Sequence, residues 1–236
     1  KRLIPLFQRS FDQNIIYFDQ KNSVSEDLYD FQIAMGSVPK LLRTNKESFA
    51  KNKKPYLKVN EKKSNRFRNQ LEKLKFEKII GVSWKSTSKV NKDRSLSLEE
   101  FILGINSPSF CFVNLQYGDT KDEISNLKKK HNINIIEIEE VDTFNGIDDL
   151  ASLIYACDQI VTIESLLPNL SGAIGISSSV LLNHKCGWRF GENNNSDYWF
   201  PSQKLFRKNE TQTWGNVLYS IQKALLSENR KIQTCD

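Results

Sequence analysis

The chain has 236 residues, and its hydrophobic content of 39% is enough for one large domain or two small ones. Its formal charge of +6 comes largely from lysines at 46–75, where aromatic residues are not regularly interleaved, so we expect solvated surface and no nucleic-acid partner. Four scattered cysteines and two histidines exclude a disulfide scaffold and lack the spacing of metal ligands, and no apolar run has the length of a membrane span or the form of a signal peptide.

The cysteines also indicate the cellular compartment of the protein. Cys111 and Cys157 fall on faces that we expect to be buried, where cysteine acts as a small hydrophobic residue. A protein of the reducing cytoplasm fits this usage, and a peripheral position at the inner membrane is the alternative.

The first 60 residues predict an incomplete unit. We expect a helix at 3–11, a short strand at 14–18, and a loop at 31–42 that turns at a glycine and enters a helix after Pro39. This is too small for a core of its own. Because the chain opens without an initiator methionine, we expect it to be an excerpt of a longer protein.

From residue 61 the pattern changes to alternating helices and strands. A lysine-rich helix at 61–75 links to apolar runs of strand length at 79–84, 110–115, 133–138, 159–163 and 178–182. Helical patterns lie between them at 97–105, 121–131, 147–157 and 166–174, and an amphipathic helix follows at 214–226. This alternation predicts an α/β fold with a doubly wound parallel sheet, whose ligand contacts lie at the carboxyl ends of the strands.

The corner Glu164–Ser165 is the first candidate site. It joins a β-branched strand to a helix rich in small residues, and Gly175 is placed to cap that helix. A helix N-terminus offers unpaired N–H groups and positive potential, which suit phosphate. A strand–helix–strand unit without a ligand is the alternative.

The loop after the first strand is the second candidate. The hydroxyls of Ser83, Ser86 and Thr87, with the cations of Lys85 and Arg94, suit a diphosphate, and arginine offers a bidentate grip. The sequences GxxxxGK[ST] and GxGxxG are absent, so neither a P-loop nor a dinucleotide fingerprint is supported. A solvated loop is the alternative.

Aromatic residues mark two further places. Gln116 and Tyr117 follow the second strand, where an amide and a ring suit a nucleobase, although Tyr117 serves equally well as plain packing. Aromatic residues and arginines also cluster at 187–190, 197–201 and 205–207, in what we expect to be a loop. They suit a domain junction or the wall of a sugar or base pocket.

At these residues the chain resembles a known family. Its segments resemble, in one order, the C-terminal part of bacterial heptosyltransferase-like glycosyltransferases, glycosyltransferase family 9, especially those behind tetratricopeptide repeats. The segments that carry the resemblance are RLIPLFQRSF at 2–11, FQIAMGSVPKLLR at 31–43, GVSWKS at 81–86, RSLSLEEF at 94–101, LQYGD at 115–119, LSGAIG at 170–175 and WFPSQKLFR at 199–207.

The resemblance implies a GT-B-like fold of two Rossmann-like domains, the first incomplete in this chain. Residues 1–60 would be the end of the acceptor-side domain and 61–75 a linker helix. Residues 76–210 would be the nucleotide-sugar-binding domain, and 211–236 a terminal helix that packs back toward the first domain. The general base would lie upstream of Lys1.

The resemblance also implies roles for individual residues. Arg94 and Glu164 would be catalytic, without a metal ion. The donor would be held by Ser83, Trp84, Lys85, Gln116, Tyr117, Ser165, Leu166 and Asn169.

The chain departs from the family pattern at two places. Glu164, Ser165 and Asn169 stand where the family commonly has Asp, Thr and His, so the carboxylate is one methylene longer and the histidine's proton acceptor is missing. Gly187 stands where the family often has Asp before Trp-Arg.

The implied activity is inverting transfer of a sugar from a nucleotide-diphosphate donor to an acceptor hydroxyl on a glycan, a lipid-linked molecule or a protein. The donor is a substrate, and no cofactor is expected. The alternative is a non-catalytic glycan- or nucleotide-binding or scaffold module built on the same fold. A sugar-nucleotide epimerase is a weaker alternative, because a second histidine–carboxylate set is not evident in the sequence.

Overall fold

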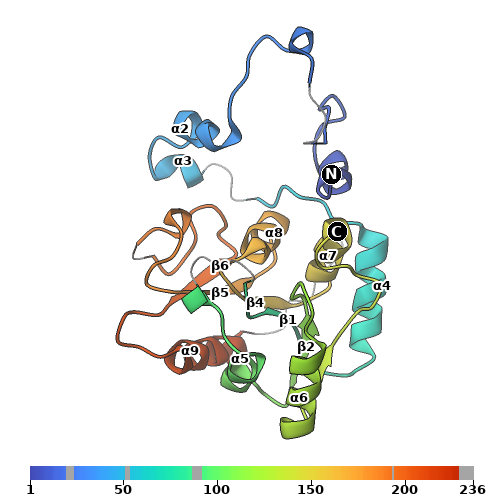
Figure 1. The fold of residues 1–236 in the computed structure, drawn as a ribbon, viewed down its shortest axis with the longest axis vertical. Coiled ribbons are helices and arrows are strands. Elements are labelled where there is room, and N and C mark those ends of the chain that lie inside the picture. Colours follow the sequence, from blue (N-terminus) through green and yellow to red (C-terminus); the bar gives the residue numbers. More distant parts are fainter. Residues whose placement is uncertain (20–23, 51–53, 87–91, 193, 229–236) are drawn as a thin grey trace.

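Parallel strands form one sheet in the computed structural model, which describes residues 1–19, 24–50, 54–86, 92–192 and 194–228 (Figure 1). The described strands are β1 (Lys78–Ser83), β2 (Phe110–Asn114), β3 (Ile135–Ile136), β4 (Gln159–Ile163), β5 (Ser178–Leu182) and β6 (Gln203–Arg207). They lie in the order β3-β2-β1-β4-β5-β6, and every neighbouring pair is parallel. This is the doubly wound order that the alternating pattern predicted.

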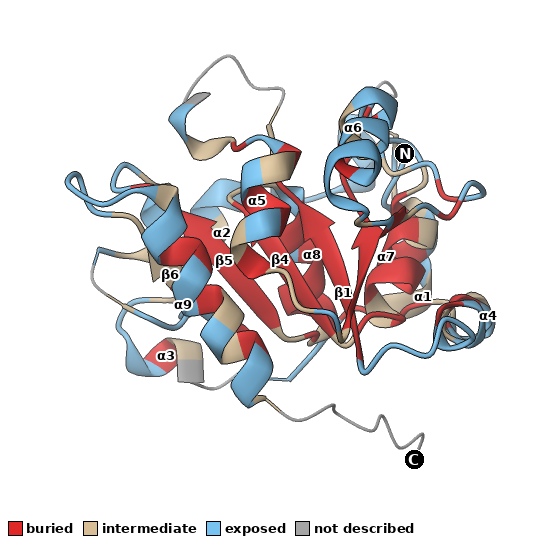
Figure 2. Ribbon diagram, turned by 90° about the horizontal axis from the view of Figure 1, so that it is seen from below, coloured by how far each residue is buried: buried red, intermediate tan, exposed pale blue. Residues whose placement is uncertain are grey.

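Helices cover both faces of the sheet (Figure 1). On one face lie α1 (Ile4–Ser10), α4 (Glu61–Glu72), α7 (Ile147–Tyr155) and α8 (Leu166–Ile174). On the other face lie α5 (Leu98–Ile105), α6 (Lys121–His131) and α9 (Trp214–Ser227). Figure 2 shows the strands and the inner sides of the helices buried and the outer sides exposed. An apolar core therefore fills each side of the sheet, as near-continuous apolar strands require.

Local signals fix the helix ends that border the candidate site. The side chain of Ser165 accepts a hydrogen bond from Leu167 N and caps the start of α8, and Gly175 ends that helix with a φ of 89°. Ser97 caps α5 by accepting from Glu100 N at 3.1 Å. The Gly175 cap confirms the prediction from the sequence, and the serines begin the two helices because short polar side chains satisfy the unpaired N–H groups of a first turn.

The strand predictions need three corrections. The third strand is limited to Ile135–Ile136, shorter than the predicted run at 133–138. Residues 14–18 are not a strand, since no neighbouring strand in the described chain offers them ladder hydrogen bonds. β6 was missed, because it follows a turn-rich aromatic loop and lies at the edge of the sheet beside β5.

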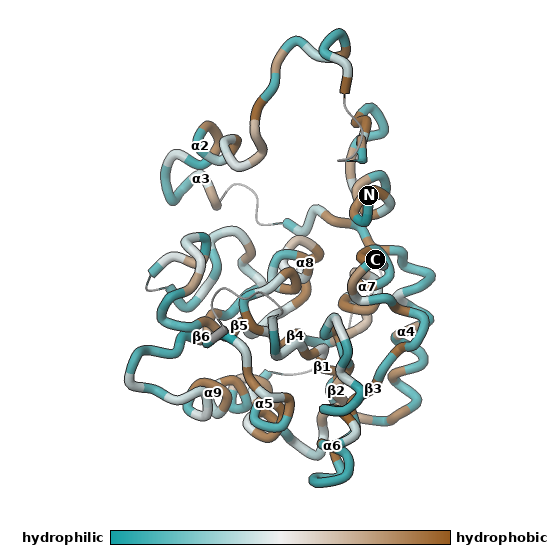
Figure 3. Tube along the Cα trace, viewed as in Figure 1, coloured by the Kyte–Doolittle hydropathy of each residue, from teal (hydrophilic) through white to brown (hydrophobic). Residues whose placement is uncertain are grey.

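The N-terminal segment leaves the α/β body and returns to it. Leu6 of α1 and Leu57 and Val59 share the core under α7 and α8. Between them the chain extends outward through η1 (Glu26–Leu28), η2 (Met35–Ser37), α2 (Val38–Leu42) and α3 (Glu47–Ala50) (Figure 1). Hydrophobic stretches of this excursion lie away from the sheet in Figure 3. Phe31 is 93% exposed and Met35 is 84% exposed.

The terminal helix α9 packs on α5 and on β6, on the face opposite α1. Short 3-10 turns, η3 (Lys92–Arg94) and η4 (Trp188–Phe190), occur in the loops after β1 and β5. None of the helices described in this structure combines the length and the apolar character needed to cross a bilayer.

Candidate functional site

The candidate site lies where the order of the strands reverses. The chain runs outward from β1 through β2 to β3 on one side, and from β4 through β5 to β6 on the other. β1 and β4 pair directly, with Ser83 opposite Thr162, so the loops that follow them leave the same edge side by side. In doubly wound sheets this switch point forms the ligand crevice.

Arg94 and Glu164 meet at this switch point. Arg94 Nη1 lies 3.9 Å from Glu164 Oε2, and the two side chains are 17% and 20% exposed. Arg94 Nη2 donates to Ser86 Oγ at 3.2 Å, which fixes the guanidinium against its own loop. The two segments that the sequence nominated separately are therefore in contact. At 3.9 Å the ion pair is too long for a direct hydrogen bond.

A second guanidinium stands near the same carboxylate. Glu164 Oε1 accepts from Gly187 N at 3.1 Å, and Arg189 lies close enough to Glu164 to interact electrostatically. Arg189 stacks over Phe190, with its guanidinium carbon 4.1 Å from the ring centre. This interaction holds the cation in a fixed position without neutralising it.

Burial shifts the pKa values of Arg189 and of its ion-pair partner, Asp197. Arg189 Nη2 lies 3.3 Å from Asp197 Oδ2. Burial lowers the pKa of Arg189, and Asp197 raises it in part. Burial likewise raises the pKa of Asp197, against the opposing effect of Arg189. Arg189 and Asp197 therefore form a partly desolvated ion pair within the aromatic clusters at 187–190 and 197–201.

Some buried polar atoms at the crevice have no hydrogen-bond partner among the described residues. They include Arg94 Nε and Arg189 Nη2. An unpaired buried donor costs about 1–3 kcal/mol, so such atoms call for an explanation. Arg189 Nη2 nevertheless lies in its ion pair with Asp197, whereas the Arg94 guanidinium has no carboxylate within direct hydrogen-bond distance in the described part of the chain, which suits an anion with several oxygens.

The corner residues are partly used by the helix that they start. Ser165 Oγ accepts from Leu167 N at 3.3 Å, and Asn169 Nδ2 donates to Ser165 O at 3.3 Å. Leu166 is exposed at the first turn of α8. Asn169 thus stabilises the corner in this structure, where the family resemblance suggested a position facing the donor.

Three of the residues predicted to bind the donor are buried in this structure. Ser83, Trp84 and Gln116 are buried, and Trp84 belongs to the core beneath α5 and α9. Gln116 Oε1 accepts from Ser83 Oγ at 2.9 Å, from Trp84 N at 3.1 Å and from Lys85 N at 3.0 Å. These hydrogen bonds order the end of β1 against the end of β2. The sequence could not reveal this, because the contact depends on the register of β1 and β2.

Lys85 and Tyr117 lie on the β2 side of the crevice. Lys85 Nζ pairs with Glu123 in the first turn of α6, so its charge already has a partner within the chain. The ring of Tyr117 lies 6.1 Å from that of Phe144, beside a cavity of about 410 Å³. Gln116, Gly118, Thr120, Glu137, Glu139 and Thr143 are among the residues that line it. Thr87, the remaining hydroxyl of the loop, lies outside the described residues.

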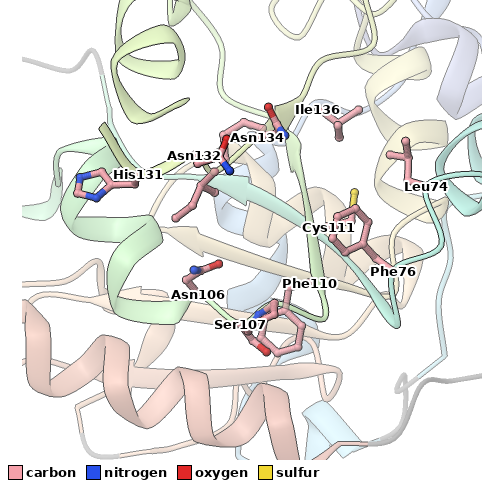
Figure 4. Close-up of a pocket in the computed structure, with 13 residues that line it drawn as sticks. Leu74, Phe76, Asn106, Ser107, Phe110, Cys111, His131, Asn132, Asn134 and Ile136 are labelled. Carbon is pink, nitrogen blue, oxygen red and sulfur yellow. The ribbon is translucent and has the colours of Figure 1, made fainter. Parts of the chain in front are cut away.

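A cavity of about 490 Å³ lies at the opposite, amino ends of β1, β2 and β3 (Figure 4). Its walls include the apolar side chains of Leu74, Phe76 and Phe110. His131, at its rim, is engaged with Glu99 at 2.7 Å. Cys111 is buried in its wall, and burial raises the pKa of that thiol to about 11. This cavity therefore lacks a free cation or a reactive nucleophile in the part of the chain that the structure describes.

Gly187 and Arg189 are the site residues that the sequence did not nominate. Two signals pointed to this segment: arginine clusters with aromatic residues at 187–190, which we interpreted as a wall or a junction, and Gly187 departs from the family pattern. Groups of three or more potential metal ligands do not occur within the described ranges.

Some known proteins are similar to this chain in sequence or in fold. No family model matches the chain. The chain is 29% identical over 242 residues to "Protein FlbA" of Caulobacter vibrioides, a match that covers 95% of this chain and 40% of that protein. It spans about two fifths of the length of this curated relative.

Solved structures are similar as well. E. coli ADP-heptose LPS heptosyltransferase II aligns with a TM-score of 0.51 at 18% identity, over 72% of this chain and 53% of that one. A glycosyl transferase family 9 structure from Veillonella parvula DSM 2008 aligns with a TM-score of 0.48 at 12% identity, over 72% and 45%. The fold is thus α/β and GT-B-like, and this chain matches about half of the heptosyltransferase.

Proposed function

We propose that this chain is the donor-binding part of an inverting, metal-independent glycosyltransferase. Its substrate is a sugar carried on a nucleoside diphosphate, and the acceptor is a hydroxyl group on a glycan, a lipid-linked molecule or a protein. The observation that carries the proposal is the meeting of Arg94 with the Glu164–Ser165 corner at the switch point between β1 and β4. The GT-B-like fold supports it.

The proposed chemistry follows from the charge that develops as the sugar leaves. The glycosidic bond to the diphosphate breaks, and the leaving diphosphate gains negative charge. The anomeric carbon takes up the acceptor oxygen on its opposite face, and the acceptor hydroxyl gives its proton to the general base that we expect upstream of Lys1. Arg94, Arg189 and the first turn of α8 are placed to stabilise that charge. We assign the nucleoside to Tyr117 and to the cavity lined by its neighbours Gln116 and Gly118.

The N-terminal segment fits an interface with a further domain. Large apolar side chains between residues 15 and 42 are exposed, and Phe31 is the most exposed of them at 93%. Contiguous exposed apolar surface is typical of a docking site for another part of a protein. We therefore propose that residues 1–60 complete an acceptor-side domain in the full-length protein. From the family resemblance alone, we also propose that tetratricopeptide repeats precede that domain.

An assay of nucleotide release on the full-length protein tests the proposal. The protein is incubated with a panel of nucleotide-diphosphate sugars, with and without a chelator, and the released nucleotide is measured. A transferase or its slow donor hydrolysis gives release from at least one donor, unaffected by the chelator. Binding of nucleotides without release from any donor would instead identify a non-catalytic module on the same fold.

A further inference from the structure

The backbone dihedral angles of residue 187 do not require glycine. Its φ is −60° and its ψ is 142°, values that any residue adopts. A side chain is instead excluded by space, because a Cβ atom at this position would lie 2.7 Å from Glu164 Oε1. Carbon and oxygen do not approach this closely without a bond, so the carboxylate and a side chain at 187 exclude one another.

Glu164 uses the space that Gly187 leaves. Its Oε1 accepts the Gly187 N–H at 3.1 Å, and its Oε2 stays 3.9 Å from Arg94 Nη1. The backbone N–H therefore holds the carboxylate just short of a direct hydrogen bond with Arg94. Arg94 Nε meanwhile has no partner among the described residues.

We infer that Gly187 is a positioning residue that keeps the Glu164 carboxylate off Arg94 and so leaves the guanidinium available to an incoming diphosphate. This inference rests on the proposed function, because it takes the crevice to be the site of a diphosphate. Without the Gly187 contact the carboxylate closes on the nearest cation with unused N–H groups. The diphosphate then has to displace a carboxylate from Arg94 before it binds.

The substitution Gly187→Ala isolates this effect from folding. The atom that the new Cβ meets is the end of a flexible side chain, which moves at little cost to the rest of the structure. Replacing glycine by alanine at an ordinary φ also restricts the unfolded chain, which favours folding slightly. Gly215→Ala near the start of α9 is a matched control, since its Cβ would meet Thr213 Oγ1 at an ordinary 3.5 Å.

The test measures the binding of inorganic pyrophosphate to the full-length protein by calorimetry. We expect Gly187→Ala to weaken binding about three- to tenfold and Glu164→Gln to strengthen it by a similar factor. In the Glu164→Gln background, Gly187→Ala should have no further effect, because no carboxylate remains to be displaced. Gly215→Ala should bind pyrophosphate like the wild type.

The inference is overturned if Gly187→Ala weakens pyrophosphate binding equally in the wild-type and Glu164→Gln backgrounds. It is also overturned if Gly187→Ala leaves the affinity of the wild-type protein for pyrophosphate unchanged. If the wild type binds no pyrophosphate, that result contradicts the proposed function itself. A second measurement then still tests the role of Gly187. In protein labelled with ¹⁵N-glycine, the Gly187 amide signal should move in Glu164→Ala, which removes its hydrogen-bond acceptor, and should stay in place in Gly215→Ala. A Gly187 amide that is insensitive to Glu164 overturns the inference by itself.

Discussion

Charged side chains at the two ends of the same sheet differ in how completely their hydrogen bonds are satisfied. At the amino end, Asp158 accepts from Ile79 N at 2.7 Å and from Arg68 Nη1 at 2.7 Å, and Lys78 Nζ donates to Glu228 O at 2.7 Å and to Leu225 O. At the carboxyl end, Arg94 and Glu164 remain 3.9 Å apart.

This difference separates structural charge from functional charge. Charges whose hydrogen bonds are complete within the chain stabilise the fold and offer little to a ligand. Charges held in place with unused donors cost folding free energy and are available for binding. We therefore propose that the sheet has a stabilising end and a binding end, and the predictions below test that division.

The largest effect is expected at the amino end. Asp158→Ala should lower the free energy of unfolding by about 3–5 kcal/mol, because it leaves the partly buried Arg68 cation and the Ile79 N–H without their carboxylate. Chemical denaturation monitored by circular dichroism measures this. Asp149→Ala, which breaks the more exposed pair with Lys63, should cost less than about 1 kcal/mol. Equal costs for the two variants would contradict the division.

At the carboxyl end the loss should appear in catalysis. Arg94→Ala should lower kcat by about 10²–10³, or about 2.7–4 kcal/mol, since it removes a charge that stabilises the leaving diphosphate. Its melting temperature should stay near that of the wild type. Arg66→Ala, which removes an exposed guanidinium paired with Glu140, should change neither quantity measurably. An unchanged kcat, or a loss explained wholly by unfolding, rejects the role of Arg94.

Lys78 provides a smaller effect with a defined pH dependence. Lys78→Met should cost about 1–2 kcal/mol of unfolding free energy at neutral pH, because Lys78 satisfies carbonyl groups at the end of α9. Burial lowers the pKa of Lys78. Between this lowered pKa and the ordinary value of lysine, the unfolded chain binds more protons. The wild type should therefore gain stability relative to Lys78→Met as the pH rises through that interval.

Denaturation curves of both proteins across the alkaline range measure this difference. Lys204→Met removes the exposed lysine that pairs with Glu228 and serves as the control. A gap between wild type and Lys78→Met that narrows with rising pH would show that the lysine is not desolvated.

Thiol reactivity is the mildest probe of the amino-end cavity. Burial raises the pKa of Cys111 to about 11, so at pH 8 only about one thiol in a thousand is ionised. In a Cys235→Ser background, Cys186 should react with a disulfide reagent much faster than Cys111 or Cys157, since the latter two are buried. The fast phase should disappear in Cys186→Ser. Rapid modification of Cys111 in the folded protein would mean that the cavity is open and reactive.

The sequence predicted the scaffold well because the scaffold depends on short-range patterns. Apolar runs such as 159–163 identify buried parallel strands, and Ser165 and Gly175 identify the ends of α8 within a few residues of those strands. Residues 14–18 show the limit of this reasoning. Their apolar, β-branched character favours a strand, but a strand forms only where a partner offers ladder hydrogen bonds.

The site was predicted in part, for a related reason. The loop to Arg94 and the corner at Glu164 could be nominated, because both follow strands of one parallel sheet. That Gln116 turns inward, and that Gly187 touches Glu164, depends on contacts between residues more than 20 positions apart in the chain. Spacing along the sequence carries no information about such contacts.

A structure of the full-length protein with a bound nucleoside diphosphate tests the central claim most directly. We predict that the phosphate oxygens lie within hydrogen-bond distance of Arg94 and of the first turn of α8, at the carboxyl edge between β1 and β4. A nucleotide bound in the cavity at the amino ends of β1, β2 and β3, or held without any contact to Arg94, would contradict the account.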